Sequence, residues 1–157
     1  MISLKNNKKG FTIVELLIVI VVIGILALLV VTTYGGIQAK ARNSKRSADV
    51  AAVQTQLEAF FSQAGYYPSL ADMNSAAWLS TNMKSLDTVA LQDPSSTSAT
   101  PKAMSATAVA KIYGYAPLNS GSTSCEADDT TCASYTLTAT YEGTVNGSGT
   151  VIKKNLD

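Results

Sequence analysis

KKGFTIVELLIVIVVIGILALLVV, residues 8–31, is the stretch that decides the fold of this chain. Between Phe11 and Val31 the only charged side chain is that of Glu15. A helix rises about 1.5 Å per residue, so this run covers roughly 30 Å, the thickness of one hydrocarbon core. The run therefore predicts a helix that spans a membrane.

Two other interpretations of this run are weaker, a cleaved secretory signal and a buried core helix. A secretory signal typically has an apolar stretch of about 7 to 15 residues followed by a small-residue cleavage site. The run here is longer, and the nearest Ala-x-Ala, at residues 39–41, lies too far downstream. No cysteine follows the run directly, which excludes a lipoprotein anchor. We expect the run to remain in the mature protein as a membrane segment.

The charge distribution and the lack of histidine exclude several function classes. The formal net charge is +1, but Lys5, Lys8 and Lys9 all lie within the first ten residues. Without them 12 − 3 = 9 basic residues face 11 acidic ones, and such a mildly acidic body argues against a general nucleic-acid binder. The chain has no histidine, which removes histidine-based triads and most zinc sites. We expect no metal and no cofactor.

Glu15 is unusual because a carboxylate inside a bilayer costs on the order of 2.5 to 3.5 kcal/mol on insertion scales. It lies one helical turn inside the run and can reach the headgroups, so by itself it is either tolerated or functional. Its context is more specific. GFTIVELLIVIVVIGILA, residues 10–27, resembles the prepilin N-terminus of type IV pilins and of the pseudopilins of type II secretion. RSADVAAVQTQLEAFFSQAGYYPS, residues 46–69, resembles the usual continuation in that family.

The resemblance implies a specific processing event. A prepilin peptidase, which is a membrane aspartyl protease, would cut between Gly10 and Phe11 and methylate the new amine of Phe11. The side chain of Glu15 would then pair with the N-terminal amine of a neighbouring subunit during assembly. Such a pair is physically reasonable, because opposite charges attract strongly at low dielectric and each is penalised when it is left unpaired.

The sequence predicts one long helix from about residue 11 to residue 64, roughly 80 Å in length. Its second half carries an apolar stripe, which Gly65 and Pro68 terminate. The members of the stripe are Val50, Val53, Leu57, Phe60 and Ala64. Residues 32–36 are weak helix formers and are the expected site of a bend or of local melting. The resemblance implies an α+β fold of lollipop form, in which the amphipathic half of the helix packs on a small antiparallel sheet of about three strands.

Shorter elements are expected in the rest of the chain. They are a helix at residues 75–83, a loop at residues 93–101, and strands from residue 111, at residues 134–141 and at residues 150–153. The middle strand is the clearest, since apolar side chains alternate with serine and threonine, so that one face should pack and the other should be wet. The last strand follows Asn146-Gly147, which is a hairpin turn signal.

The two cysteines enclose an acidic loop. Cys125 and Cys132 are spaced too widely for a CxxC redox or metal pair, and in an exported protein they are expected to form one disulfide. The acidic residues Glu126, Asp128 and Asp129 lie between them. These carboxylates either bind calcium or form a solvated loop. We favour the solvated loop, because the spacing lacks the pattern of an EF-hand loop.

A basic cluster, Lys40, Arg42, Lys45 and Arg46, follows the membrane run. Residues 37–47 lack a strong apolar stripe, so this stretch is expected to be solvated in a monomer or buried only against other subunits. We interpret the cluster as a solvated collar or as a source of ion pairs between subunits. DNA binding is the less favoured alternative, because no aromatic residues interleave with these cations.

The expected organisation is a leader at residues 1–10, a transmembrane and polymerisation helix at residues 11–36, and a head at residues 37–157. The expected function is that of a structural subunit of a type IV pilus filament, and not that of an enzyme. A pseudopilin of a type II secretion or DNA-uptake system is the alternative. A single-pass membrane-anchored enzyme is remote, because no nucleophile elbow, phosphate loop or metal cluster is present.

The expected partners follow from this function. They are identical or related pilin subunits, the prepilin peptidase, the pilus assembly platform in the membrane and, before assembly, membrane lipid. Charge alone does not orient the chain, because lysines and arginines flank both ends of the run. The expected disulfide and the acidic, Ser/Thr-rich body favour an outside head and an inside N-terminus. The chain would lie first in the cytoplasmic membrane and then in an extracellular filament.

Overall fold

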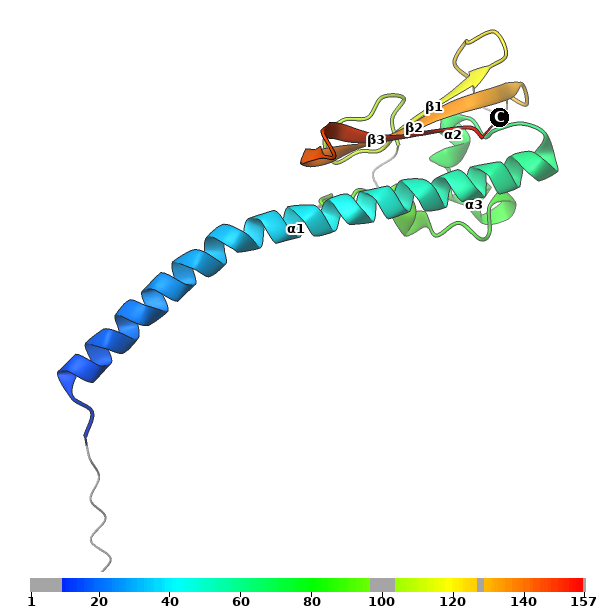
Figure 1. Cartoon of the computed structure of the whole chain (residues 1–157). Coiled ribbons are helices and arrows are strands. Elements are labelled where there is room, and N and C mark those ends of the chain that lie inside the picture. The colour runs from blue at the N-terminus through cyan, green and yellow to red at the C-terminus, as the bar shows by residue number, and fades with distance from the viewer. Residues whose placement is uncertain (1–9, 97–103, 127–128, 157) are drawn as a thin grey trace, which may run out of the picture. The chain divides into compact units, whose positions relative to one another are not determined.

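The computed structural model describes residues 10–96, 104–126 and 129–156. Three α-helices, one 3-10 helix and three strands follow one another along these residues (Figure 1). They are α1 (Ile13–Ala64), α2 (Leu70–Met73), α3 (Ala76–Asn82), η1 (Thr88–Leu91), β1 (Gly114–Asn119), β2 (Cys132–Val145) and β3 (Ser148–Lys154). The chain divides into two compact units, Met1–Gln38 and Ala39–Asp157.

The first unit contains the apolar part of α1. A bend or local melting was expected at residues 32–36; the helix runs through them without interruption, so local melting does not occur there. Every large apolar side chain described between Phe11 and Val31 is exposed, by between 47% and 85%. Within the described residues α1 is the one helix long and apolar enough to cross a membrane, with a mean hydropathy of 3.4 in its most apolar window.

The second unit is built on an antiparallel sheet in the order β1-β2-β3. Tyr135, Leu137 and Ala139 of β2 are buried and Tyr141 is half-buried, which confirms the predicted packed face. Across the sheet, Tyr115 pairs with Leu137 and Ala139 pairs with Val151. Neighbours in a ladder share a face, so this register gives one apolar side to the whole sheet. The predicted α+β fold class with three antiparallel strands is confirmed.

The strand boundaries differ from the expected ones because of two turns. The first strand begins at Gly114 and not at Lys111, which has a φ of 67° in a turn closed by a bridge between Val109 and Ile112. A side chain at Gly114 would place its Cβ 2.4 Å from the backbone nitrogen of Ala108, so only glycine fits there. The predicted Asn146-Gly147 turn joins β2 to β3, both residues having positive φ.

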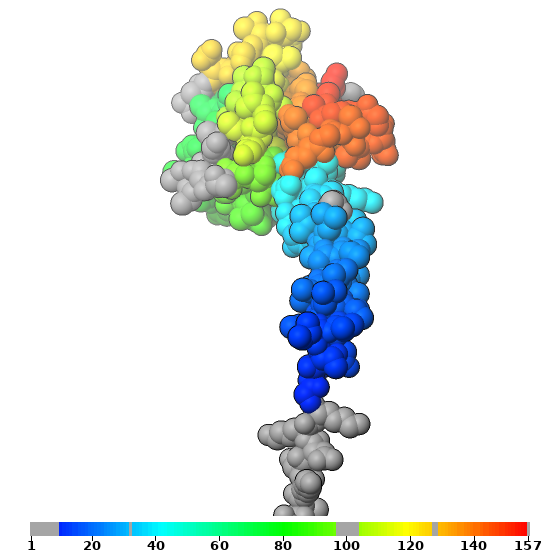
Figure 2. All heavy atoms as spheres, turned by 90° about the vertical axis from the view of Figure 1, so that its left-hand side faces the viewer, coloured from blue at the N-terminus to red at the C-terminus, as the bar shows by residue number. Residues whose placement is uncertain are grey.

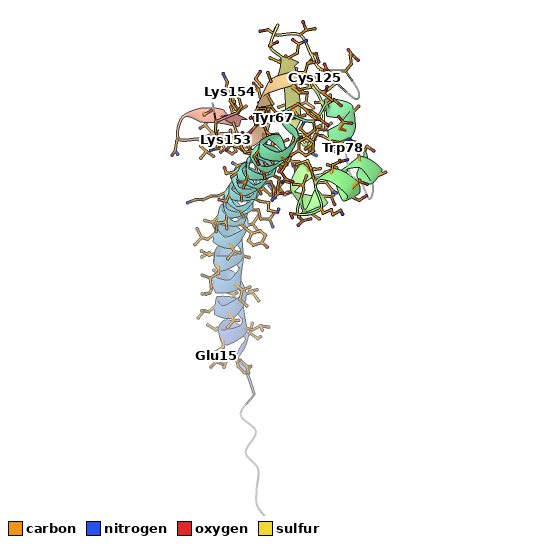
Figure 3. The ribbon with its side chains drawn as sticks, turned by 90° about the vertical axis from the view of Figure 1, so that its right-hand side faces the viewer. Glu15, Tyr67, Trp78, Cys125, Lys153 and Lys154 are labelled. Carbon is orange, nitrogen blue, oxygen red and sulfur yellow. A yellow bond between two sulfur atoms is a disulfide. The ribbon has the colours of Figure 1, made fainter. Side chains whose placement is uncertain are left out.

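The core lies between the sheet and the second half of α1. Val50, Val53 and Leu57 of the predicted stripe are buried and Phe60 is partly buried, but Ala64 is exposed, contrary to expectation. Gly65, with a φ of 80°, reverses the chain after α1. The returning Tyr67 is fully buried and stacks on Phe61, so its ring fills the core at this end (Figure 3).

The connection between α1 and the sheet contains α2, α3 and η1. The predicted helix at residues 75–83 is confirmed as α3, which starts after the N-cap Ser75. Four-residue elements such as α2 and η1 are too short for periodicity to reveal, and they were not expected. Of the predicted loop at residues 93–101, residues 93–96 form a turn and the remainder lies outside the described residues.

Candidate functional site

The predicted processing site lies at the beginning of the described chain. Gly10 and Phe11 precede α1 and are both exposed, and the ring of Phe11 is 84% exposed. Apart from its chain neighbours, no atom of the described residues lies within 4 Å of the position that a Cβ would take at Gly10. The fold therefore leaves room for a side chain at residue 10. Any requirement for glycine at this position must come from something that approaches the backbone from outside.

Thr12 and Glu15 cap the N-terminus of α1 together. The Glu15 carboxylate accepts a hydrogen bond from the Thr12 backbone N–H at 2.8 Å and one from the Thr12 hydroxyl at 2.7 Å. In return, the Glu15 backbone N–H donates to the Thr12 hydroxyl oxygen at 3.2 Å. This reciprocal arrangement is a capping box, and it holds the carboxylate beside the first turn. The Thr-x-x-Glu spacing could have revealed Thr12 as a partner of Glu15, but sequence reasoning missed it.

The apolar surface of α1 is the largest feature of the first unit. Apolar side chains cover the helix all round, and a helix of that kind belongs in a membrane or among other helices. None of the most apolar window of this helix, drawn in blue in Figure 2, is buried within the described residues. The surface must therefore be covered by lipid or by other chains.

The two arginines of the basic cluster do not belong to the solvated collar that was expected. Arg46 is 1% exposed, and it pairs with Asp93 at 2.6 Å and with Glu142 at 2.9 Å. Arg42 also binds Glu142 through two nitrogens, and Lys45 binds Asp49. These pairs form within one chain and not between subunits. The interpretation as a solvated collar or as intersubunit ion pairs was wrong for Arg42 and Arg46, because their acidic partners lie far away in the sequence. Lys45 stays exposed beside Asp49, four residues further along α1. Lys40 remains exposed.

Asn43 fixes the register between α1 and the sheet. Its side-chain nitrogen donates to the Glu142 carbonyl oxygen at 3.1 Å, and its side-chain oxygen accepts from the Glu142 N–H at 2.9 Å. The same oxygen accepts a hydrogen bond from Arg46. Asn43 thus pairs with the strand backbone as a neighbouring strand would. We name Arg42, Asn43, Arg46, Asp93 and Glu142 together the arginine cluster.

The charges of the arginine cluster stabilise one another. Hydrogen bonds from Arg42, supported by those from Arg46, lower the pKa of Glu142 to about 2. Burial by itself would raise the pKa of Asp93, but hydrogen bonds from Arg46 and Ser95 outweigh it and lower that pKa. Both carboxylates are therefore ionised at neutral pH. A buried ion pair of this kind is costly to break, because the remaining charge stays in the interior.

Glu58 organises a second polar group beneath the sheet. Its two carboxylate oxygens accept hydrogen bonds from the hydroxyls of Tyr67, at 2.9 Å, and Tyr135, at 2.7 Å. The rings of Tyr67 and Tyr135 meet edge to face, with centroids 4.7 Å apart. This group ties the end of α1 to the turn that follows it and to β2. Both carboxylate oxygens of Glu58 already accept hydrogen bonds, so this group is structural and leaves no free carboxylate for chemistry.

The two cysteines form the expected disulfide, Cys125–Cys132. It closes the loop that leads into β2. Asp129, one of the candidate calcium ligands, accepts hydrogen bonds from the backbone and hydroxyl of Thr131, while Glu126 is exposed. Asp128 lies outside the described residues. These contacts stabilise a turn inside the disulfide loop.

Comparison with known proteins identifies the N-terminal part of the chain. Residues 5–31 match the model of the prokaryotic N-terminal methylation motif. Type II secretion system core protein G of Dickeya chrysanthemi is 35% identical over 66 residues, which are 42% of this chain and 43% of that protein. The type IV major pilin protein PilA of Myxococcus xanthus is 34% identical over 66 residues, 42% of this chain and 30% of that protein.

A further relative is the type IV major alpha-pilin of Moraxella bovis, 36% identical over 72 residues, 46% of this chain and 45% of that protein. The matched part spans less than half the length of each of these relatives. No solved structure matches the chain. The resemblance to the type IV pilin and pseudopilin family is confirmed over this N-terminal part.

Proposed function

We propose that this chain is a structural subunit of a type IV pilus filament that polymerises through its N-terminal helix. One observation carries the proposal. The methylation motif opens a helix whose apolar side chains are exposed on every side. Such a surface suits lipid before assembly and the helices of other subunits afterwards. The chain would therefore act by assembly and not as an enzyme.

Processing would create the assembling form. A prepilin peptidase would remove residues 1–10 as a leader and methylate the amine of Phe11, leaving residues 11–36 as the membrane and polymerisation helix. The exposed position of Gly10 and Phe11 supports this, since a protease must reach the bond between them. The open space around Gly10 is consistent with recognition by an external groove rather than with a need of the fold.

Glu15 would receive the new amine of a neighbouring subunit. The capping box with Thr12 supports this role, because it holds the carboxylate at the first turn of α1, close along the chain to residue 11. An ammonium and a carboxylate attract strongly at low dielectric, and each is penalised when it is unpaired. The pair would thus favour both entry into the filament and one stagger between subunits.

A pseudopilin of a type II secretion or DNA-uptake system is the second candidate. The observation that favours it is the similarity to the core protein G of type II secretion systems. Pilins and pseudopilins share the N-terminal features, so these do not separate the two. The disulfide in the head favours a pilin, whereas a calcium site in the head would favour a pseudopilin.

The proposed location follows from the same features. The N-terminus would lie on the cytoplasmic side of the cytoplasmic membrane, with residues 37–157 outside, and the assembly platform in that membrane would extract the subunit. The oxidised cysteine pair supports an outside head, because disulfides persist in oxidising compartments. After assembly the head would be carried on an extracellular filament.

Purified surface filaments test the proposal. Filaments sheared from the producing cells should contain this chain as a main component, and its N-terminal peptide should begin with a methylated Phe11. Cells that lack the chain should lose these filaments. If they keep their filaments but stop releasing folded proteins into the medium, the pseudopilin candidate is correct and the pilin proposal is wrong.

A further inference from the structure

A cavity of about 310 Å³ opens beside the arginine cluster. Arg42 and Arg46 of α1 line it together with Ser95, Lys111, Tyr141 and Glu142. Figure 2 shows the three parts around it: the yellow-green segment near residue 110, the orange β2–β3 hairpin and the cyan part of α1. The assembly role proposed above makes no use of this cavity.

The walls of the cavity carry an excess of positive charge. Three cationic side chains line it against the single carboxylate of Glu142, which is already held by Arg42 and Arg46. Lys111 is exposed, and no ion pair of its ammonium group is found within the part of the chain that the structure describes. An anion that enters the cavity therefore meets an ammonium group that is still available.

The two arginines of the cavity are held in place before any ligand arrives. Asp93 binds Arg46 from behind, and Glu142 binds Arg42, so neither guanidinium must be ordered on binding. Pre-organised groups lose little conformational entropy when a ligand binds. Ser95, Ala110, Thr140 and Tyr141 complete the lining. This mixture suits an ester of phosphoric acid, which has an anionic group and a carbon skeleton, better than a small, fully hydrated ion.

The position of the cavity along the chain points to a membrane lipid. Lys40 and Arg42 follow Gly36, the last residue of the proposed membrane segment, by four and six residues of the same helix. Helix rise places them roughly 6 and 9 Å further along α1, which is within about one Debye length of a charged membrane surface. Each lysine or arginine at that depth strengthens binding to anionic lipid by about fivefold.

We propose that this cavity binds the phosphate headgroup of an anionic phospholipid while the subunit waits in the membrane, with Lys111 as the group that contacts the phosphate. The inference rests on the proposed membrane insertion of residues 11–36. A bound lipid would hold the head close to the membrane surface. It would be released when the subunit leaves the bilayer for the filament.

Lipid binding by the purified full-length chain in detergent micelles tests the proposal. Native mass spectrometry would count bound lipid during titration with phosphatidylglycerol, with phosphatidylcholine of the same acyl chains, and with inorganic phosphate as competitor. Phosphatidylglycerol should bind more tightly than phosphatidylcholine, and Lys111→Gln should weaken it by about fivefold without affecting phosphatidylcholine. Lys154→Gln is the matched control, since it removes an exposed lysine of β3 (Figure 3). Lys154→Gln should leave the affinity for both lipids unchanged.

Three results would overturn the proposal. The first is equal affinity for the two lipids, and the second is an equal loss of affinity for phosphatidylglycerol in Lys111→Gln and Lys154→Gln. The third is displacement of the lipid by inorganic phosphate, which would show a site for free phosphate. Circular dichroism should show that both variants remain folded, as expected for exposed side chains. The assay needs neither processing nor filaments, so its outcome is independent of whether the chain is a pilin.

Discussion

Arg46 and Asp93 form a buried ion pair with two contacts, Nε to Oδ2 at 2.6 Å and Nη2 to Oδ1 at 3.0 Å. Both side chains are at most 2% exposed. The pair joins α1 to the turn that follows η1, and Glu142 extends it to β2. Three segments that are distant in the sequence are thus attached to one another at a single arginine.

Removal of Arg46 should destabilise the second unit strongly. Arg46→Met leaves the buried Asp93 carboxylate without a cationic partner, so the free energy of unfolding should fall by about 3 to 5 kcal/mol. Chemical denaturation of the full chain in detergent, followed by the fluorescence of Trp78, measures this change. Lys40→Met is the control and should change stability by less than about 0.5 kcal/mol, because Lys40 is exposed. Equal effects of the two variants would contradict the structural role of Arg46.

The stability of the second unit should fall in acid because of Glu142. Its pKa is lowered from 4.5 to about 2, so the folded state binds this proton less readily than the unfolded state does. The resulting stabilisation is complete above pH 4.5 and is lost as the pH falls towards 2. In Glu142→Gln the slope of stability against pH over this window should be smaller. An unchanged slope in acid titrations followed by circular dichroism would rule the contribution out.

Thr12→Ala should loosen the first turn of α1. It removes the hydroxyl that caps the helix and the hydrogen bond to Glu15, a loss of about 1 kcal/mol. Hydrogen exchange at the amides of residues 14–16 should become faster, whereas Thr12→Ser should behave like the natural chain. Unchanged exchange in Thr12→Ala would mean that the capping box does not stabilise this end.

Glu15→Ala should permit cleavage but impair filament assembly, because the amine of Phe11 would lose its proposed partner. Glu15→Gln separates the two roles of this side chain, since the amide oxygen can still accept hydrogen bonds from Thr12 but carries no charge. If charge pairing drives assembly, both variants should give few surface filaments on electron micrographs. Normal filaments in Glu15→Gln would show that the cap suffices without the charge.

Gly10→Phe should yield an unprocessed precursor held in the membrane. The fold itself tolerates a side chain at this position, so the block would arise in the groove of the peptidase. Gel mobility and the N-terminal sequence report the cleavage. Gly36→Ala is the control, since residue 36 also has open space around it and lies outside the proposed leader. A mature protein of normal size from Gly10→Phe would disprove the cleavage assignment.

Local patterns in the sequence were enough to predict much of this fold. The apolar run, the cap at Gly65, the alternation in β2 and the Asn146-Gly147 turn are all properties of neighbouring residues, and the structure confirms each of them. Ala64 was assigned wrongly to the core because periodicity does not show where a helix passes beyond its sheet. Tyr67 fills the end of the core in place of Ala64, because the chain reverses at Gly65.

The sequence by itself determined the apolar run, the methylation motif that overlaps it and the longer elements of the head, because these depend on spacings of a few residues. Only the tertiary structure decided that Arg46 is buried rather than solvated, and that Asn43 and Glu142 set the register of helix and sheet. Asn43 and Glu142 are 99 residues apart, and Arg46 and Asp93 are 47 residues apart. A charge looks solvated in the sequence when its partner is distant, because burial and pairing arise only when the folded chain brings the two together.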